Sequence, residues 1–258
     1  MSAWNTLIVD VSERVATVTL NRPPVNAQNT EMRDELTALF DELSDRDDVM
    51  SVVLTGNGKV FSAGADIRER PNLGDNPGAY GRHNRRVRET HNAIEECAKP
   101  VIAAVNGAAL GAGFGLVMAS DIWVASEAAY FSMPEINVGL AGGISFLQRI
   151  FGRSRARRMF YTGMEVSAAE MYRLGLVEAC LPPAELMPYA MKIAHEIAGK
   201  APIAVKLAKE AARMTLTMPL RDAYRYEQGN TVALSKTEDS KEAQRAFLEK
   251  RKPKYVGR

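Results

Sequence analysis

The stretch VIAAVNGAALGAGFGLVMASDIW, residues 101–123, constrains the fold of this chain more than any other segment. A strand-like apolar pentapeptide runs through four glycines, Gly107, Gly111, Gly113 and Gly115, into an apolar segment of helical character. Each glycine in a helix costs about 1 kcal/mol relative to alanine. The run therefore indicates a strand that turns into a helix at a place where close backbone approach matters more than helix stability.

The rest of the chain divides into a mixed part and a helical part. Alternating β-branched residues predict strands over residues 6–11, 15–20, 50–56, 101–105, 121–126 and 129–132. Between them, a helix capped by Asn29 or Thr30 carries apolar residues at helical spacing. After residue 134 nearly every segment predicts a helix. We expect an α/β core over residues 1–195, a helical region over residues 196–258, and a mobile loop over residues 71–81.

Composition excludes several classes of protein. The chain has 258 residues, and 33 Lys and Arg balance 31 Asp and Glu, so bulk charge gives no argument for nucleic-acid or membrane binding. Cys97 and Cys180 form no CxxC pair, and the three histidines lack metal spacing. The same spacing predicts no metal site, and with no signal peptide, membrane segment or peroxisomal C-terminus in the sequence we expect a cytoplasmic protein.

Three well-known functional motifs are absent from the sequence, each because required residues are missing. A dinucleotide fingerprint needs a glycine where Leu116 stands, and the segment around Lys59 lacks the Ser or Thr of a phosphate loop. Neither Ser62 nor Ser145 has the flanking glycines of a nucleophile elbow. His91 lies roughly in line with the thin apolar stripe of its helix, so we interpret it as a packed structural histidine.

Two similar loops remain. FSAGADI (residues 61–67) and NGAALGAGFG (residues 106–115) each follow a buried strand and lead into a helix. The first N–H groups of a helix have no intrahelical partner. One such donor from each loop, directed at one oxygen, would form an oxyanion hole worth about 3–4 kcal/mol. The alternative is that both are ordinary tight turns.

Glu135 is the candidate proton-transfer residue. It follows a proline and has apolar neighbours in sequence, Met133, Ile136, Val138 and Leu140. Apolar surroundings disfavour a carboxylate and raise its pKa toward a value useful for acid–base catalysis. A solvent-facing glutamate in a turn is the alternative.

Several segments together resemble the crotonase (enoyl-CoA hydratase/isomerase) superfamily. They occur in the same order and spacing, cover essentially the whole chain, and are specific only in combination. The segments are NRPPVNAQN, VVLTGNGKVFSAGADIRE, KPVIAAVNGAALGAGFGLVMASDIWVAS, FSMPEINVGL, TGMEVSAAEMYRLGLV and FLEKRKP.

The resemblance implies a spiral of ββα units with a helical C-terminal trimerisation region, assembled as a trimer or a dimer of trimers. It implies an acyl-CoA thioester substrate whose carbonyl lies between the N–H groups of Ala65 and Ala112, with Glu135 as the acid/base. Since coenzyme A is part of the substrate, no further cofactor is implied. By position, the residues that contact substrate or CoA are Ala27, Ala63, Asp66, Ile67, Gly111 and, across a subunit boundary, Lys250.

One departure leaves the reaction open. Hydratases with two glutamates carry the first at the position of Gly115, and some relatives have an aspartate at the position of Gly142. A single Glu135 suits hydration or dehydration, isomerisation of an enoyl-CoA, or the related hydratase-lyase and CoA-thioester hydrolase reactions. A non-catalytic relative that binds acyl-CoA or RNA is a further alternative. The small Gly115 also predicts room for a bulkier acyl group.

Overall fold

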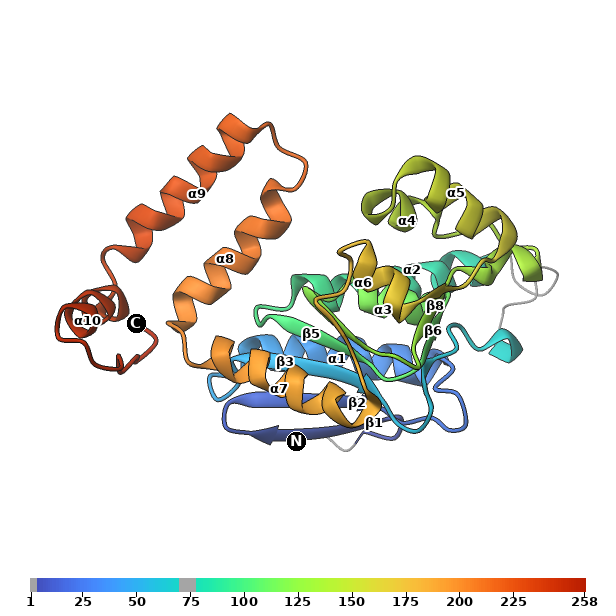
Figure 1. Ribbon diagram of the computed structural model, residues 1–258, viewed down its shortest axis with the longest axis horizontal. Helices are drawn as coiled ribbons and strands as arrows, with labels where there is room; N and C mark the ends of the chain where they lie inside the picture. Colours follow the sequence, from blue (N-terminus) through green and yellow to red (C-terminus); the bar gives the residue numbers. More distant parts are fainter. Residues whose placement is uncertain (1–3, 70–77) are drawn as a thin grey trace.

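A six-stranded sheet forms the centre of the computed structural model, which describes residues 4–69 and 78–258 (Figure 1). Its strand order is β1-β2-β3-β5-β7-β10; β1 is antiparallel to β2, and the other neighbours are parallel. The strands are β1 (Leu7–Ser12), β2 (Val15–Leu20), β3 (Ser51–Gly56), β5 (Val101–Val105), β7 (Ile122–Ser126) and β10 (Ala179–Leu181). The six strands predicted from the sequence are confirmed, five of them in this sheet.

Both faces of this sheet are covered, which explains its continuous apolar strands. All six residues of β3 are buried. Because side chains alternate across a strand, Val52 packs in the cluster that includes α1 (Thr30–Asp45), whereas Val53 packs against α7 (Pro183–Ala198) on the other face. Asn29 caps α1, as predicted, by accepting a hydrogen bond of 2.9 Å from the Met32 N–H.

A second, smaller sheet has the strand order β4-β6-β8-β9. Its strands are β4 (Val60–Ser62), β6 (Ala108–Leu110), β8 (Tyr130–Ser132) and β9 (Val166–Ser167). We expected no strand within the two loops at residues 61–67 and 106–115, and this was wrong: β4 extends into the first, β6 lies in the second, and the two strands pair in parallel. Strands of three residues are too short for an alternating pattern to show.

The four glycines of the opening stretch serve different contacts. A Cβ on Gly107 would collide with the backbone carbonyl of Lys59, so this glycine permits close approach, not only a turn. A Cβ on Gly113 would lie 2.8 Å from Cβ of Ser62. Gly111 has φ +52° and precedes α3 (Ala112–Met118). Gly115 faces a side chain of another helix, described below.

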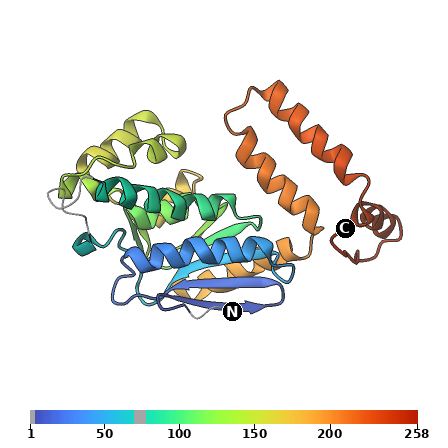
Figure 2. The ribbon, with the colours of Figure 1, turned by 180° about the vertical axis from the view of Figure 1, so that it is seen from behind.

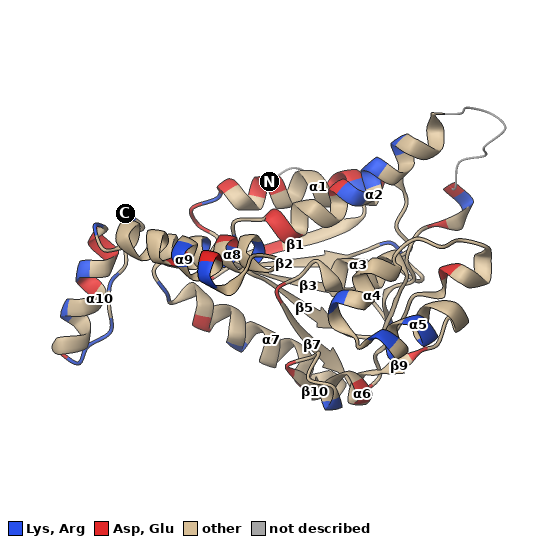
Figure 3. Ribbon diagram, turned by 90° about the horizontal axis from the view of Figure 1, so that it is seen from above, with Lys and Arg blue, Asp and Glu red and all other residues tan. Residues whose placement is uncertain are grey.

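Helices cover the smaller sheet. α2 (Ala79–Glu96) packs along α1, and their exposed faces carry charges of both signs, whereas the central strands are uncharged (Figure 3). The remaining short helices are η1 (Ile67–Glu69), η2 (Pro134–Val138), α4 (Ile144–Ile150), α5 (Arg153–Thr162) and α6 (Ala168–Arg173). Most of the predicted mobile loop, residues 71–77, lies outside the described residues.

The last three helices project from the body of the molecule in both views (Figures 1 and 2). They are α8 (Pro202–Thr215), α9 (Leu220–Leu234) and α10 (Glu238–Leu248). Large apolar side chains on them are exposed, among them Leu220, Phe247 and Leu248. None of the helices in the described part of the chain is long and apolar enough to cross a membrane.

Candidate active site

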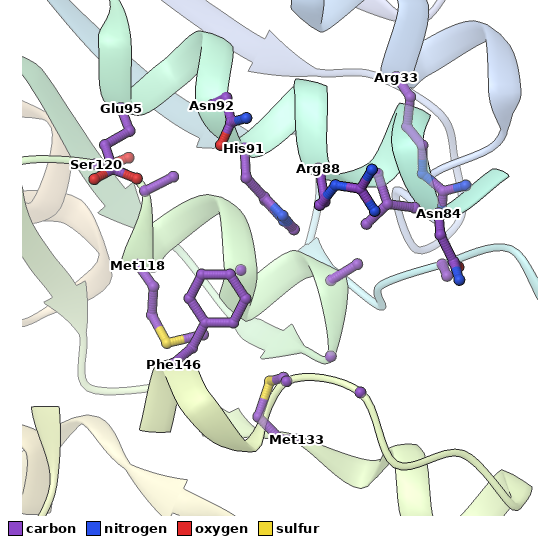
Figure 4. A pocket seen from close by; sticks show the side chains of 18 of the residues that line it. Arg33, Asn84, Arg88, His91, Asn92, Glu95, Met118, Ser120, Met133 and Phe146 are labelled. Carbon is purple, nitrogen blue, oxygen red and sulfur yellow. The ribbon is translucent and has the colours of Figure 1, made fainter. Parts of the chain in front are cut away.

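A cavity of about 840 Å³ lies among α2, α3, α4, α8 and the loop that follows β4 (Figure 4). Six residues predicted from the sequence line it: Ala65, Asp66, Ile67, Gly111, Ala112 and Glu135. The structure therefore gathers both glycine loops and the candidate acid around one space.

The two predicted N–H donors follow a paired position in the small sheet. Ser62 of β4 pairs with Ala109 of β6, and each donor, Ala65 or Ala112, lies three residues beyond its member of this pair. Neighbouring strands are about 4.8 Å apart. The pairing thus brings the two N–H groups to adjacent positions at one end of the sheet.

Gly64 closes the contact between these loops. It has φ +87°, and a Cβ there would lie 2.5 Å from the Leu110 carbonyl oxygen and 3.2 Å from the Ala112 nitrogen. Neither the Ala65 nor the Ala112 N–H donates a hydrogen bond to any described residue. Both donors are therefore available to a ligand.

Glu135 lies against the start of α3. Its Oε1 would be 2.6 Å from a Cβ on Gly111, so a side chain there would displace the carboxyl, and the φ of +52° separately favours glycine. Its Oε2 is buried and has no hydrogen-bond partner among the described residues. Burial raises the pKa of this carboxyl, as predicted. The cause differs in part, because Ile136 and Val138 are exposed and the neighbours that line the cavity are Met133 and Leu140.

His91 occupies the space beside Gly115. A Cβ on Gly115 would collide with Nε2 of His91 and lie 2.9 Å from its Cε1. The predicted room for a bulkier acyl group at Gly115 is therefore wrong, because an imidazole fills it. His91 is packed, as predicted, with its ring edge-to-face against Phe146, but it also points into the cavity (Figure 4).

The imidazole of His91 is held in its neutral form. Burial lowers its pKa to about 4, and a hydrogen bond to the Ala112 backbone opposes this effect only in part. A neutral imidazole carries one N–H donor and one lone pair. Sequence reasoning gave this residue no functional role, since nothing in the pattern of α2 shows that it faces Gly115.

Arg33 is a second residue that the sequence analysis missed. It belongs to the buried face of α1, is 1% exposed, and borders the cavity (Figure 4). Its Nε and Nη2 have no hydrogen-bond partner in the described part of the chain. Nearby carboxylates are engaged elsewhere: Asp34 pairs with Arg86 at 2.6 Å, and Glu69 accepts from the Thr30 N–H at 2.6 Å. No ion pair among the described residues joins this guanidinium; Glu69, Asp34 and Asp66 act on it through space and raise its pKa, whereas burial lowers the pKa by more.

Asp66 fixes the loop between β4 and η1. Its carboxylate pairs with Arg22 at 2.9 Å and with Arg68 at 2.8 Å, and these partners hold its pKa far below the ordinary value. Ile67, beside it, is exposed at the cavity. Asp66 therefore shapes the loop, and Ile67 offers an apolar surface to a ligand.

Three predicted contact residues do not line the cavity of a single chain. Ala27 and Ala63 are half-buried on adjacent segments, joined through the Ala63 N–H to the Val25 carbonyl at 2.9 Å. Lys250 is exposed just after α10, a helix that lies away from the sheets (Figure 1). Its contact across a subunit boundary stays a prediction. Over residues 4–69 and 78–258, no group of three His, Cys, Asp or Glu side chains is arranged to hold a metal ion.

Solved structures share this fold over nearly the full chain. The crystal structure of an enoyl-CoA hydratase from Bacillus anthracis superposes with a TM-score of 0.92 at 35% identity, covering 98% of this chain and all of that one. The structure of Pseudomonas aeruginosa DspI gives a TM-score of 0.92 at 31% identity, covering 99% of this chain and 98% of that one. The predicted crotonase-type α/β fold is confirmed.

Sequence comparison gives the same class. The profile of the enoyl-CoA hydratase/isomerase family matches residues 10–258. A short-chain-enoyl-CoA hydratase of Clostridium acetobutylicum is 38% identical over 96% of both chains. The chain belongs to the enoyl-CoA hydratase/isomerase family of enzymes, within the crotonase superfamily.

Proposed function

We propose that this enzyme hydrates, dehydrates or isomerises an enoyl-CoA, and that it stabilises a thioester enolate during the reaction. The observation that carries the proposal is the contact at Gly64, where two free N–H groups meet within reach of Glu135. Family membership supports it, as does the activity named for relatives such as the C. acetobutylicum short-chain-enoyl-CoA hydratase.

The chemistry follows from the separate roles of these groups. The N–H groups of Ala65 and Ala112 donate to the thioester oxygen, which becomes more negative as an enolate forms. Fixed donors of this kind contribute about 3–4 kcal/mol to a transition state. Glu135, whose buried carboxyl has a raised pKa, takes a proton and returns it at carbon, as a general acid/base with a pKa nearer neutrality can.

The CoA arm and the assembly belong to the same proposal. The arm would run past Ala27 and Ala63 to Ile67, and Lys250 of a neighbouring subunit would reach its phosphates. The exposed apolar side chains of α8–α10 support an assembly of several chains, and the family resemblance makes that assembly a trimer or a dimer of trimers.

A panel of CoA thioesters, read by product mass, tests the reaction class. Hydration adds 18 mass units, about the mass of one water, and isomerisation none, whereas hydrolysis or carbon–carbon cleavage releases fragments. If the protein binds acyl-CoA but converts no member of the panel, a non-catalytic protein is favoured and the proposal is overturned.

Glu135→Gln tests the acid/base. We expect kcat to fall about 10²–10⁴-fold with little change in the Kd for a saturated acyl-CoA, because the amide keeps the shape of the carboxyl but transfers no proton. Glu127→Gln, on an exposed turn outside the cavity, is the matched control and should keep wild-type turnover. Undiminished turnover in Glu135→Gln would exclude the assigned role.

A further inference from the structure

His91 and Glu135 meet the same face of α3. Gly111 and Gly115 are one helical turn apart, joined by the Gly115 N–H donating to the Gly111 carbonyl at 2.9 Å. The Glu135 carboxylate lies over Gly111, and the His91 imidazole lies over Gly115. Gly111 itself precedes the helix, with φ +52° and ψ −122°, and this hydrogen bond keeps the two glycines within one turn, about 5.4 Å along the axis. The carboxylate and the imidazole, each beside one of these glycines, are therefore separated by roughly one turn.

That separation suits one bridging water. Two hydrogen bonds of about 2.8 Å span about 5.6 Å, and a buried water needs at least two polar partners. Glu135 lines the cavity and offers Oε1, the carboxyl oxygen beside Gly111, whereas its Oε2 is buried. With the N–H of His91 directed at the Ala112 backbone, the neutral ring keeps a lone pair for an O–H donor.

We infer that His91 takes the place of the first glutamate of two-acid hydratases and positions the water that adds to the enoyl-CoA. The inference rests on the proposed function and selects hydration from the reactions that it leaves open. It also explains Gly115, since any side chain there would collide with the ring.

The addition of water conserves atoms, protons and electron pairs with Glu135 as its one acid/base. The water oxygen bonds to the β-carbon while Glu135 takes one water proton and the carbon–carbon π pair moves into the thioester enolate. Glu135 then gives that proton to the α-carbon, and the carbonyl re-forms. His91 accepts a hydrogen bond from the other O–H, which stays on the product hydroxyl, so the imidazole gains and loses no proton.

Two assays separate this role from the proposed function. Hydration of crotonyl-CoA needs the positioned water, whereas exchange of the α-hydrogens of butyryl-CoA in D₂O needs only the two N–H donors and Glu135. For His91→Ala we expect kcat for hydration to fall about 100-fold with KM within about threefold, while exchange is largely retained. A structural role alone would lower both activities together and shift the melting temperature in parallel.

A swap provides the second variant. In His91→Ala/Gly115→Glu the vacated space admits a carboxylate, and hydration should recover at least tenfold over His91→Ala, on the scale of one acid–base group. In the single variant Gly115→Glu, hydration should not rise above the wild-type rate, because the Cβ at residue 115 collides with the His91 ring. His195→Ala is the matched control, since His195 lies on α7 beside Glu13 and outside the cavity lining, and it should behave as wild type.

The outcomes of these assays distinguish failure of the inference about His91 from failure of the proposed function. The inference is overturned if His91→Ala hydrates crotonyl-CoA normally, if hydration and exchange fall together, or if the swap recovers nothing. It is also overturned if the wild-type enzyme exchanges butyryl-CoA but hydrates no enoyl-CoA, a result that leaves the proposed function standing. Exchange that persists in Glu135→Gln would instead refute the proposed function.

Discussion

Gly64 is the residue on which the geometry of the two loops depends. Its φ of +87° is unfavourable for any residue with a Cβ, and its position leaves no space for one beside the Leu110 carbonyl. The contact serves two needs at once, since the same residue turns the chain and lets the β4 loop touch the Ala112 nitrogen.

Gly64→Ala should therefore lower both stability and turnover. We expect a loss of more than about 2 kcal/mol in the free energy of unfolding, combining a strained φ with a clash, and a tenfold or greater fall in kcat as the donors separate. Gly58→Ala is the control, because Gly58 has φ +80° with no atom within 4 Å of its Cβ position. Urea unfolding measures the free energy of unfolding of each variant, and steady-state kinetics measures its kcat. If Gly64→Ala and Gly58→Ala lose equal stability and equal kcat, the role of close packing at Gly64 is contradicted.

Some residues of the candidate site could be predicted from the sequence, and others could not. Glu135 was predictable because a carboxyl among apolar neighbours has a known chemical consequence. His91 and Arg33 were not, because their surroundings come from segments remote in sequence: Gly115 lies on a different helix from His91. The only local signal was a charged residue on the apolar face of a helix, as at Arg33 between Met32 and Leu36.

At the scale of an element, the segment 63–67 is anchored rather than free. Gln28 donates to the Gly64 carbonyl at 2.7 Å and accepts from the Asp66 N–H at 3.0 Å, and the Asp66 carboxylate pairs with Arg22 and Arg68. Such anchoring holds the Ala65 donor in place without a regular strand.

Asp66→Asn tests the anchor through its pH dependence. Ion pairing holds the folded pKa of Asp66 far below 3.8, so the carboxylate contributes stability above about pH 4 and loses that contribution as the pH falls. We expect a loss of about 1.5–3 kcal/mol at pH 7 that narrows toward pH 3. Asp48→Asn removes an exposed pair with Arg46 and should leave stability nearly unchanged, because solvent screens an exposed pair. A pH-independent loss in Asp66→Asn would contradict the ionic role.

Elements with strong periodic signals were predictable, and short ones were not. Five strands of the large sheet and helix α1 carry runs of apolar residues long enough to predict their type, and the strand bounds to within one residue, whereas the short β10 was not predicted. β4 and β6 have three residues each, and their pairing depends on contacts between residues nearly 50 positions apart. The small sheet therefore became visible only in three dimensions.

At the scale of the whole molecule, α8–α10 carry an apolar surface that the chain itself does not cover. Phe247 is 83% exposed and Leu248 80%, and both belong to the helix that leads to Lys250. A region of this kind is stable when a second chain covers it.

Phe247→Glu/Leu248→Glu should shift the protein toward smaller species. Burying a charge in an apolar interface is unfavourable, so light scattering should show a smaller mass at micromolar concentration, and the KM for CoA esters should rise if Lys250 acts across subunits. Ile8→Glu, an exposed apolar residue on β1, is the control and should leave the mass unchanged. A wild-type protein that is monomeric at millimolar concentration would refute the assembly.

The pairing of Ser62 with Ala109 has an evolutionary consequence. The two N–H groups are placed by a backbone ladder, so no point mutation except one to proline can delete them. Mutations can then exchange the groups around the proposed carbonyl site, such as glutamate for glycine at 115 or another ring at 91, while the proposed means of activating a thioester is inherited intact. A lineage with this scaffold can change its reaction by small steps without first losing its substrate.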